Sequence, residues 1–536
     1  MLGLLLKKLH FQRKNQNSKK ASVQHSSPIC LSKNLDENLQ LLKEALGQSS
    51  DVIIRDMKIS SNSNVDAAII YIDGLVDRNL VNHDILQPLM LNLQLIKENV
   101  SQNHSSLIDF IKSSVLTVGQ IIVADDIDRV ISDVLAGHTA ILVEGVTQAL
   151  LIDAKGWKSR SLEEAKNELA IRGPRIGFNE TLRTNTALLR RIIRDPRLTI
   201  ESLQIGERSK TEIAIVYIKG IIKDSLIDEI EQRLKRISAD AILDVGYIEQ
   251  YIEDNPLSVF STIGNSERPD VTAARVLEGR AAILVDGSPF ALTVPMLFIE
   301  GFQSPEDYYA RPHYASFLRW IRFLAFALSV YLPAIYVALM SFHQELLPSP
   351  LLITVAAAKE GIPLPVGIEA IFMIILFEIL REAGLRMPRT LGQAVSIVGA
   401  LVIGQSAVSA GLVGAPMVVV LATTAIASFV APSQADLGAL LRILVVIVAG
   451  FLGLFGVVII SVEILSYLAS LRSLGVPYLS PVTPLDIRSL KDTFIRAPLW
   501  AMDSRPASLD PNDTRRQSPD QMPQAPKTKS GKRERQ

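Results

Sequence analysis

Four long apolar runs in the second half of the chain constrain its fold more than any other feature. They are rich in Leu, Ile, Val, Ala and Gly, and they cover Ile321–Met340, Val366–Leu380, Ala394–Val430 and Leu440–Leu468. A helix needs about 20 residues to cross a bilayer; the first, third and fourth runs reach that length, and the second reaches it with its flanks. We therefore expect an α-helical polytopic membrane domain, preceded by a soluble region.

Composition limits the function classes that this chain of 536 residues can belong to. Lys plus Arg and Asp plus Glu number 55 each, so net charge gives no argument for a nucleic-acid partner. The single cysteine, Cys30, excludes an intramolecular disulfide and a cysteine-built metal site. The sequence contains no phosphate-binding G-x-x-x-x-G-K-[ST] loop, no H-E-x-x-H and no G-x-S-x-G. We expect a protein that is not an enzyme and that has no cofactor or metal.

The soluble region contains an internal repeat. Ala67–Gly74 (AAIIYIDG) is echoed 146 positions later by Ile213–Gly220 (IAIVYIKG). His138–Gly145 (HTAILVEG) is echoed 142 positions later by Arg280–Gly287 (RAAILVDG). The first motif is a β-branched run that ends in Gly before a helical segment, and the second indicates two strands joined by a turn. Two similar offsets in the same order predict two related α/β subdomains.

These patterns divide the chain into six parts. The expected parts are a disordered tail (1–34), a first cytoplasmic α/β subdomain (35–160), an Arg-rich helical bridge (161–210), a second cytoplasmic α/β subdomain (211–310), the transmembrane domain (311–475) and a cytoplasmic C-terminal tail (476–536).

The bridge carries a candidate basic interaction face. Its four arginines are Arg183, Arg190, Arg194 and Arg197, and their spacing would place them on one side of a helix. Such a face could bind phosphate, anionic lipid or an acidic surface of a neighbouring subunit, and a solvated face is the alternative. No aromatic residues interleave with these arginines, so we do not expect a nucleic-acid platform.

Basic residues predict the orientation of the membrane domain. Arg311 and Arg319 flank the start of the first run, Arg389 follows the second, and Lys491 follows the last, whereas the loop at 343–350 carries only Glu345. Basic residues favour the cytoplasmic side, so both termini are expected there, with an even number of crossings. Because the third run is interrupted at 411–416, four net crossings are preferred and six remain the alternative.

Two carboxylates lie within the second apolar run and its flank. Glu369 is near its outer end and Glu378 near its inner end. They are nine residues apart, which puts them on opposite faces of a helix, so they cannot both line one pore. Both are candidate membrane carboxylates, because burying a charge in the bilayer costs free energy and such a residue is therefore expected to have a functional role.

The third run contains a stripe of mostly small residues at helical spacing. Five residues of this run are candidates for a pore and gate. Four belong to the stripe and one is a polar neighbour, Gln405; the stripe members are Ser396, Gly399, Ile403 and Ser406. Small-residue stripes also permit close helix packing, and this alternative stays open. In the pore interpretation, Ile403 is the bulky apolar member that would close the path by excluding water.

Several longer motifs resemble one known family. They are IEQYIEDN at 248–255, SERPD at 266–270, AAILVDGSPF at 281–290, FQSPEDYY at 302–309, FEILREAGL at 377–385 and GVPYLSP at 475–481. In this order they resemble the GerA family of spore germination proteins, specifically the A subunit, from about Leu35 to Trp500. The sequence departs from the family after Pro256, where LSVFSTIGN replaces a proline-rich segment.

The resemblance implies a function that composition does not give. It implies a subunit of a nutrient germinant receptor in the spore inner membrane, which assembles with a transporter-like B subunit and a lipoprotein C subunit. It also implies a homo-oligomeric ring that forms a ligand-gated cation channel within membrane lipid. The alternatives are a stage V sporulation homologue that amplifies germination and, from another class, a secondary transporter.

Overall fold

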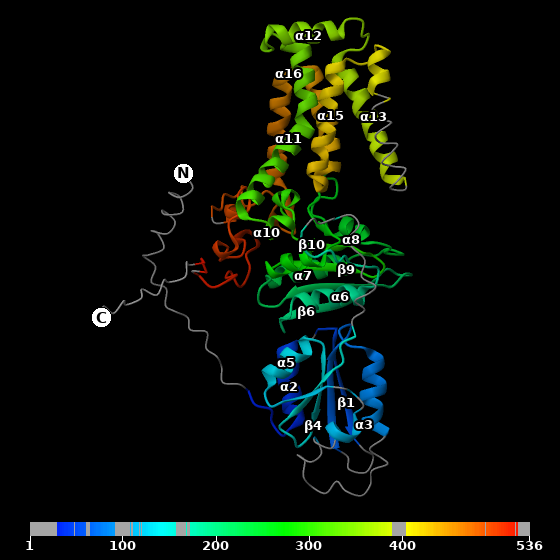
Figure 1. The fold of residues 1–536 in the computed structure, drawn as a ribbon, viewed down its shortest axis with the longest axis vertical. Helices are drawn as coiled ribbons and strands as arrows, with labels where there is room; N and C mark the ends of the chain where they lie inside the picture. The colour runs from blue at the N-terminus through cyan, green and yellow to red at the C-terminus, as the bar shows by residue number, and fades with distance from the viewer. Residues whose placement is uncertain are drawn as a thin grey trace, which may run out of the picture. The chain divides into compact units, whose positions relative to one another are not determined.

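The computed structural model describes residues 29–523 except 48, 60–64, 92–107, 109, 110, 117, 119, 157–167, 169–171, 388–401, 403, 488 and 520. The chain forms two compact units. The first contains residues 1–48 and 52–156, and the second contains residues 49–51 and 157–536. Figure 1 shows the fold of both units.

The first unit is built on a five-stranded antiparallel sheet. The strands lie in the order β1 (Val52–Ile59), β2 (Val65–Ile72), β4 (His138–Val143), β5 (Ala149–Asp153) and β3 (Ile121–Ala124). Their β-branched and aliphatic side chains fit a pleated sheet that is covered on both faces. Helices α2 (Leu35–Leu46) and α5 (Ile127–Leu135) pack together on the sheet. The π-helix Leu80–Leu86, α3 (Gln87–Leu91) and the short helix Ile111–Val115 contribute to a further apolar core.

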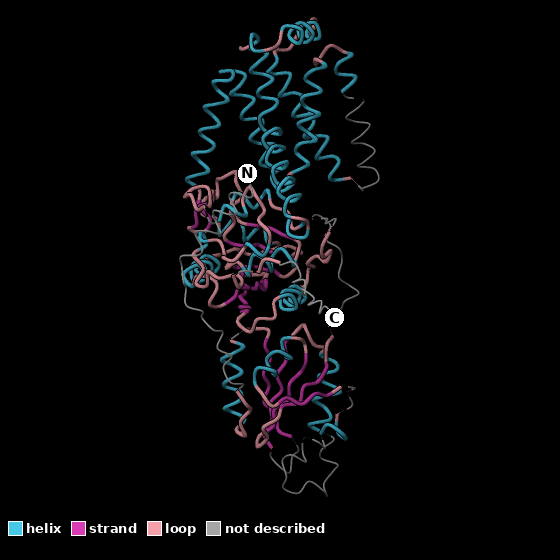
Figure 2. Tube along the Cα trace, turned by 60° about the vertical axis from the view of Figure 1, so that its left-hand side comes forward, coloured by secondary structure: helices cyan, strands magenta, loops and turns pink. Residues whose placement is uncertain are grey.

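The second unit begins with a sheet of the same design. Its strands lie in the order β6 (Leu198–Ile205), β7 (Thr211–Ile218), β9 (Ala281–Val285), β10 (Ala291–Val294) and β8 (Gly264–Ser266). Helices α6 (Leu182–Ile192) and α9 (Pro269–Leu277) pack on one face, and α7 (Asp224–Lys235) and α8 (Val245–Ile252) on the other. Figure 2 shows the strands of both sheets in magenta.

The two sheets share strand order and register. The pair Val52–Ile72 of β1 and β2 corresponds, 146 positions later, to the pair Leu198–Ile218 of β6 and β7. The pairing of β4 with β5 recurs in β9 with β10 at the offset of 142. The matching strand order and register confirm the prediction of two related α/β subdomains. A slip of one residue in either sheet would have turned every side chain of the strand to the other face and broken this match.

The repeat extends to a helix cap that closes each subdomain. Glu144 Oε2 accepts the backbone N–H of Leu35 at 2.7 Å, and Asp286 Oδ1 accepts that of Leu182 at 3.0 Å. Each carboxylate lies just after a sheet strand and binds the first turn of a helix distant in sequence. The sequence pattern indicated only a turn here. The structure adds that its acidic residue satisfies a free helix N–H group and favours the positive helix end.

The segment 161–210 differs from the expected helical bridge. Its described residues include helix α6 and strand β6, which occupy the same places in the second sheet as α2 and β1 do in the first. The strand β6, LTIESLQI, is buried at Leu198 and Ile200 and exposed at Ser202 and Gln204, and it lies at one edge of the sheet.

The remainder of the second unit contains a block of long apolar helices. These are α11 (Pro312–Phe342), α12 (Ser349–Lys359), α13 (Val366–Arg386), α15 (Ala415–Val430) and α16 (Ala435–Ser470). Two stretches of the described chain, Pro312–Phe342 and Pro432–Ser470, are long and apolar enough to cross a membrane. Helix α11 packs against α13, α15 and α16, and α12 lies across one end of the block (Figure 1).

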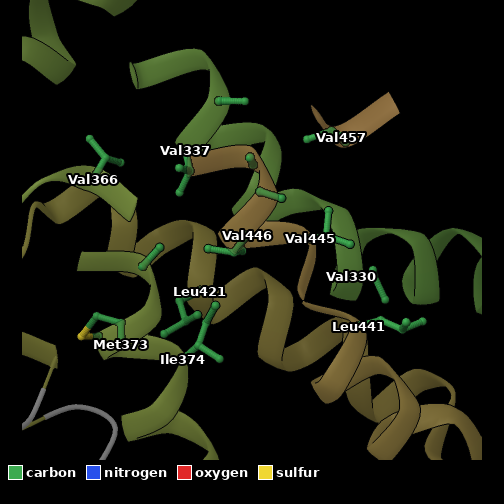
Figure 3. Close-up of a cluster of buried hydrophobic side chains, with 14 of the residues drawn as sticks. Val330, Val337, Val366, Met373, Ile374, Leu421, Leu441, Val445, Val446 and Val457 are labelled. Carbon is green, nitrogen blue, oxygen red and sulfur yellow. The ribbon is translucent and has the colours of Figure 1, made fainter. Parts of the chain in front are cut away.

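The core of this block is aliphatic. Val330 and Val337 of α11, Ile374 of α13, and Val445 and Val446 of α16 are buried together (Figure 3). β-Branched side chains suit such a core because they lose little rotamer freedom on burial. The predicted interruption of the third run is present, since α15 begins only after a turn in which Gly411 has φ +65°.

Helix α16 folds back on itself at Gly453. This residue has φ +63° and ψ −148°, a backbone region that is essentially restricted to glycine. A Cβ atom there would lie 2.8 Å from Cε1 of His343, just beyond the end of α11. At the two ends of α16, Gln434 lies against Gly301 and Ser473 Oγ donates to the carbonyl of Thr262, so both ends return to the second α/β subdomain.

This turn predicts opposite effects for two neighbouring glycines. Gly453→Ala should destabilise the detergent-purified chain by about 1–3 kcal/mol or more, because the backbone conformation is unfavourable and the methyl group meets His343. Gly450→Ala should be neutral or stabilising, because Gly450 is helical and its Cβ position is open. Thermal unfolding monitored by tryptophan fluorescence would measure both, and equal midpoints for the two variants would contradict the turn.

Candidate functional site

A buried ionic network joins the second α/β subdomain to the helical block. Asp307 lies in the short helix α10 (Glu306–Tyr309). Its carboxylate binds Arg322 of α11 through two hydrogen bonds of 2.9 Å each and lies 3.2 Å from Nη2 of Arg319. The side chains of Asp307 and Arg319 are fully buried. The two arginines are three residues apart, which places them on one face of α11.

The C-terminal segment completes this network. Arg319 also binds the Asp492 carboxylate at 3.0 Å and donates to the carbonyl of Thr493 at 3.2 Å. The hydroxyl of Tyr308 donates to Asp492 Oδ2 at 2.8 Å, and burial together with the Asp492 charge raises the pKa of Tyr308. Removal of one partner would leave a buried charge unpaired, which typically costs about 3–5 kcal/mol.

Aromatic side chains surround the network. Phe302 stacks on Phe323 of α11 with ring centroids 4.3 Å apart, and Trp320 stacks on Phe494 at 5.7 Å. Offset stacking adds to the apolar area that these rings bury. The segment before α11, the start of α11 and the tail after α16 therefore form one packed junction.

Glu378 is part of a second ionic group within the helical block. It binds Arg381 one turn away at 2.9 Å and Arg442 of α16 at 3.1 Å. Arg442 is buried and also donates to the carbonyl of Ser329 in α11 at 2.7 Å. Sequence reasoning missed Arg442. The signal was a single arginine inside the apolar run Leu440–Leu468, where an unpaired charge would be costly.

Glu369 lies at the opposite end of α13. Its side chain is fully buried, and Oε1 accepts the backbone N–H of Gly414 at 2.6 Å, next to the first residue of α15. Lys359, the last residue of α12, lies beside the same glycine. The structure therefore separates Glu369 from Glu378 along α13, and neither carboxylate contacts the other.

The four arginines of the expected basic face do not share a helix surface. Helix α6 ends at Ile192, so Arg194 and Arg197 lie beyond it. Arg190 is buried and binds both oxygens of Asp51 at 2.8 and 2.9 Å. Arg197 pairs with Asp195 at 2.9 Å. Only Arg183, which is partly exposed near the start of α6, keeps the expected position on a solvent-accessible helix surface.

The candidate pore stripe is described only in part. Ser396, Gly399 and Ile403 lie outside the described residues. Gln405 and Ser406 lie in a helical stretch that ends before Gly411, and both are exposed. Exposed polar side chains on an otherwise apolar helix are free to meet water or another chain.

The second α/β subdomain has a large open hollow of about 1420 Å³ beside α7. Arg233 on its wall binds Glu229 at 2.7 Å and Asp254 at 2.6 Å. Burial and the nearby Glu249 charge raise the pKa of Glu253 on the same wall. Because charges of both signs line the hollow and pair with each other, it has no clear preference for an anionic or cationic ligand.

The chain is similar to known proteins over both α/β subdomains and the helical block. A family model described as Bacillus/Clostridium GerA spore germination protein matches residues 40–508. Spore germination protein KA of Bacillus subtilis (strain 168) is 43% identical over 499 residues, which cover 93% of this chain and 90% of that protein. Spore germination protein GerLA of Bacillus cereus is 38% identical over 484 residues, which cover 90% of this chain and 96% of that protein.

One solved structure is also similar. The crystal structure of the N-terminal domain of the A subunit of the Bacillus megaterium spore germinant receptor GerK3 is 40% identical. The match covers 51% of this chain and 99% of that chain, with a TM-score of 0.40. Since the family model and the two full-length relatives span both α/β subdomains and the helical block, the chain belongs to the GerA family of spore germination proteins.

Proposed function

We propose that the chain is the A subunit of a spore nutrient germinant receptor that acts as a cation channel in the spore inner membrane. The observation that carries this proposal is the family match over residues 40–508, which includes the subdomains and the apolar helices in one alignment. The proposed partners are further copies of the same chain in a ring, a transporter-like B subunit and a lipoprotein C subunit.

We further propose that the helical block crosses the membrane six times, with both termini cytoplasmic. Helix α11 starts at the ionic network and ends near Gly453. Helix α13 starts at Val366, where Glu369 contacts Gly414, and its other end approaches Asp436 through Arg381. Helix α15 leads from Gly414 back to Ser433, whose hydroxyl donates to the carbonyl of Gly301. The return from the inner end of α13 to Gly411, which includes the helical stretch before Gly411, is the third pass, and the two halves of α16 add the last two. The fold at Gly453 favours six passes over the four that the sequence analysis preferred.

Accessibility of two exposed positions separates the six-pass and four-pass arrangements. Asp436 precedes the first half of α16, and its side chain is 99% exposed. In six passes it is cytoplasmic, whereas in four passes it is external. In a Cys30→Ser background, a membrane-impermeant maleimide applied to intact cells should label Ser349→Cys. It should label Asp436→Cys only after permeabilisation. External labelling of Asp436→Cys would contradict six passes and favour four.

The channel proposal places the conduit at the axis of a ring of subunits. Within one chain the described core of the helical block is formed largely by aliphatic side chains, which are an unfavourable lining for a hydrated path. Gln405 and Ser406 are the described members of the candidate set, and both are exposed in the isolated chain. A ring that turns the small-residue stripe inward would place Ile403 of each copy around the path, where apolar side chains close a pore by excluding water.

Substitution at Ile403 tests the channel proposal. Ile403→Ser should release monovalent cations from dormant spores without nutrient, because a hydroxyl lowers the cost of wetting the constriction. Ile403→Phe should block the nutrient-induced release. Val402→Ser is the matched control, since Val402 precedes Ile403 in the sequence and is exposed, and neighbouring positions of a helix point about 100° apart.

Cation release and protein abundance would be measured together in spores of each variant. Normal abundance of Ile403→Ser with a normal, nutrient-dependent response would contradict the gate. Low abundance of both Ile403 variants with no leak would instead assign the stripe to helix packing.

A further inference from the structure

An exposed glutamate lies within the last apolar pass of the helical block. Glu463 belongs to the second half of α16, after the turn at Gly453. It is ten residues after Gly453 and ten before Ser473, which returns the chain to the α/β subdomain. At a rise of 1.5 Å per residue, Glu463 is about 15 Å along the helix direction from each of these residues. The carboxylate is therefore inside the pass, at a distance from both ends that its side chain cannot bridge.

A second charge at a similar distance from the turn shows how the chain satisfies such a group. Arg442 lies in the first half of α16, eleven residues before Gly453, and is buried. It binds Glu378 at 3.1 Å and donates to the carbonyl of Ser329 at 2.7 Å. Glu463, in contrast, forms no ion pair or hydrogen bond with any residue that the structure describes. Charged residues inside membrane helices almost always have a partner, so that of Glu463 has to come from outside the described chain.

The helix face around Glu463 is otherwise apolar. Phe455, Ile459 and Val462 lie on this face at spacings of four and three residues. Their side chains are 67%, 43% and 59% exposed, whereas Val457 on the other side of the helix is buried in the core of the block. Large apolar side chains are an unfavourable lining for water, and they suit the packing of another membrane helix.

Lipid alone does not satisfy this face. Lipid tails match the apolar side chains but offer no partner to a carboxylate, and the short side chain of Glu463 does not reach the headgroups from this position. The occupant therefore has to supply apolar surface and a positive charge at the same place. A membrane helix with one lysine or arginine supplies both, because these side chains carry a permanent charge and several N–H donors.

A second copy of the chain does not supply this charge from the residues that the structure describes. Five basic side chains of its long helices are already in ion pairs; they are Arg319, Arg322, Arg381, Arg386 and Arg442. The remaining one, Lys359, lies beside Gly414 at the start of α15, and the other end of α15 leads to the α/β subdomain. The occupant is therefore a different chain.

We propose that the face of α16 formed by Phe455, Ile459, Val462 and Glu463 binds a membrane helix of a different protein, whose lysine or arginine pairs with Glu463. The proposal rests on the proposed function only for the membrane setting. In the receptor proposed above, the transporter-like B subunit would be this protein. The conduit proposed at Ile403 uses another helix of the chain.

Site-specific photocrosslinking in spore membranes tests this surface on the full-length chain. With p-benzoylphenylalanine in place of Ile459, one turn from Glu463, irradiation should link the chain to a membrane segment of a different protein. Mass spectrometry should find a lysine or arginine within about one helical turn of the linked residue. The matched control has p-benzoylphenylalanine in place of Leu465, which is exposed but about 200° around the helix from Glu463, and it should not link to that segment.

Three crosslinking results would overturn the surface. They are links to lipid only, links to another copy of the chain, and links to a segment without a basic residue.

Charge reversal gives a result that a folding defect cannot imitate. Glu463→Arg should lower the yield of the link from position 459 about tenfold or more per molecule of chain, because two positive charges would then meet. Glu463→Asp should retain most of the yield. Replacement of the identified basic residue by glutamate should restore the link to the Glu463→Arg chain and weaken the link to the wild-type chain. An unchanged yield in Glu463→Arg, or no restoration by the paired reversal, would also overturn the surface.

Because crosslinking reports contact and not conduction, it separates this proposal from the channel. A charge-dependent link in spores whose Ile403 variants release cations normally would retain the surface and reject the gate. A leak in Ile403→Ser together with links to lipid only would do the reverse.

Discussion

The buried carboxylate of Asp307 is the interaction on which the architecture of the second unit depends. It lies between Arg319 and Arg322 at the start of the helical block, and the same Arg319 binds Asp492 from beyond the last helix. Charges buried to this degree are tolerated only when each has its partners. The network therefore fixes the direction in which α11 leaves the α/β subdomain and returns the chain after α16 to the same place.

This network holds the second α/β subdomain and the helical block together as one structural unit. Both belong to one compact unit, whereas the first subdomain forms a unit with its own sheet and core. The two subdomains share their strand register and an acidic residue that caps the first helix. In the described chain, only the second subdomain belongs to the same unit as the long apolar helices of the helical block. A force applied to the second subdomain would thus reach α11 through paired charges and stacked rings, without a flexible linker in between.

Much of the fold could be predicted from local pattern. The repeat at Ala67–Gly74 and Ile213–Gly220 predicted equivalent strands, because both copies are β-branched apolar runs that end in Gly before a helical segment. The apolar runs specified the helices, and the glycine and proline at 411–416 specified a break. These features depend on residues that are neighbours in sequence, which is why sequence reasoning could find them.

Features that depend on distant residues could not be found in this way. Arg190 looked like part of a basic face because its partner, Asp51, is 139 residues away. Strand β6 was missed although its sequence alternates, since the surrounding arginines suggested a helix. Gly453 is one of several glycines in its run, and only the contact with His343 shows that it turns the chain. For the same reason Glu369 could be identified as unusual, but its contact with Gly414 could not.

Hydrogen exchange of the purified full-length chain, followed by mass spectrometry, is the most direct test of the junction. In Asp307→Asn, amides in three separate segments should lose protection together: the turn at 298–302, the first turns of α11 and the tail at 489–496. Joint loss is expected because these segments share one buried network, while β6 and β7 should remain protected. Faster exchange confined to the residues next to 307, with α11 and the tail unchanged, would contradict the view that this carboxylate holds the subdomain and the helices as one unit.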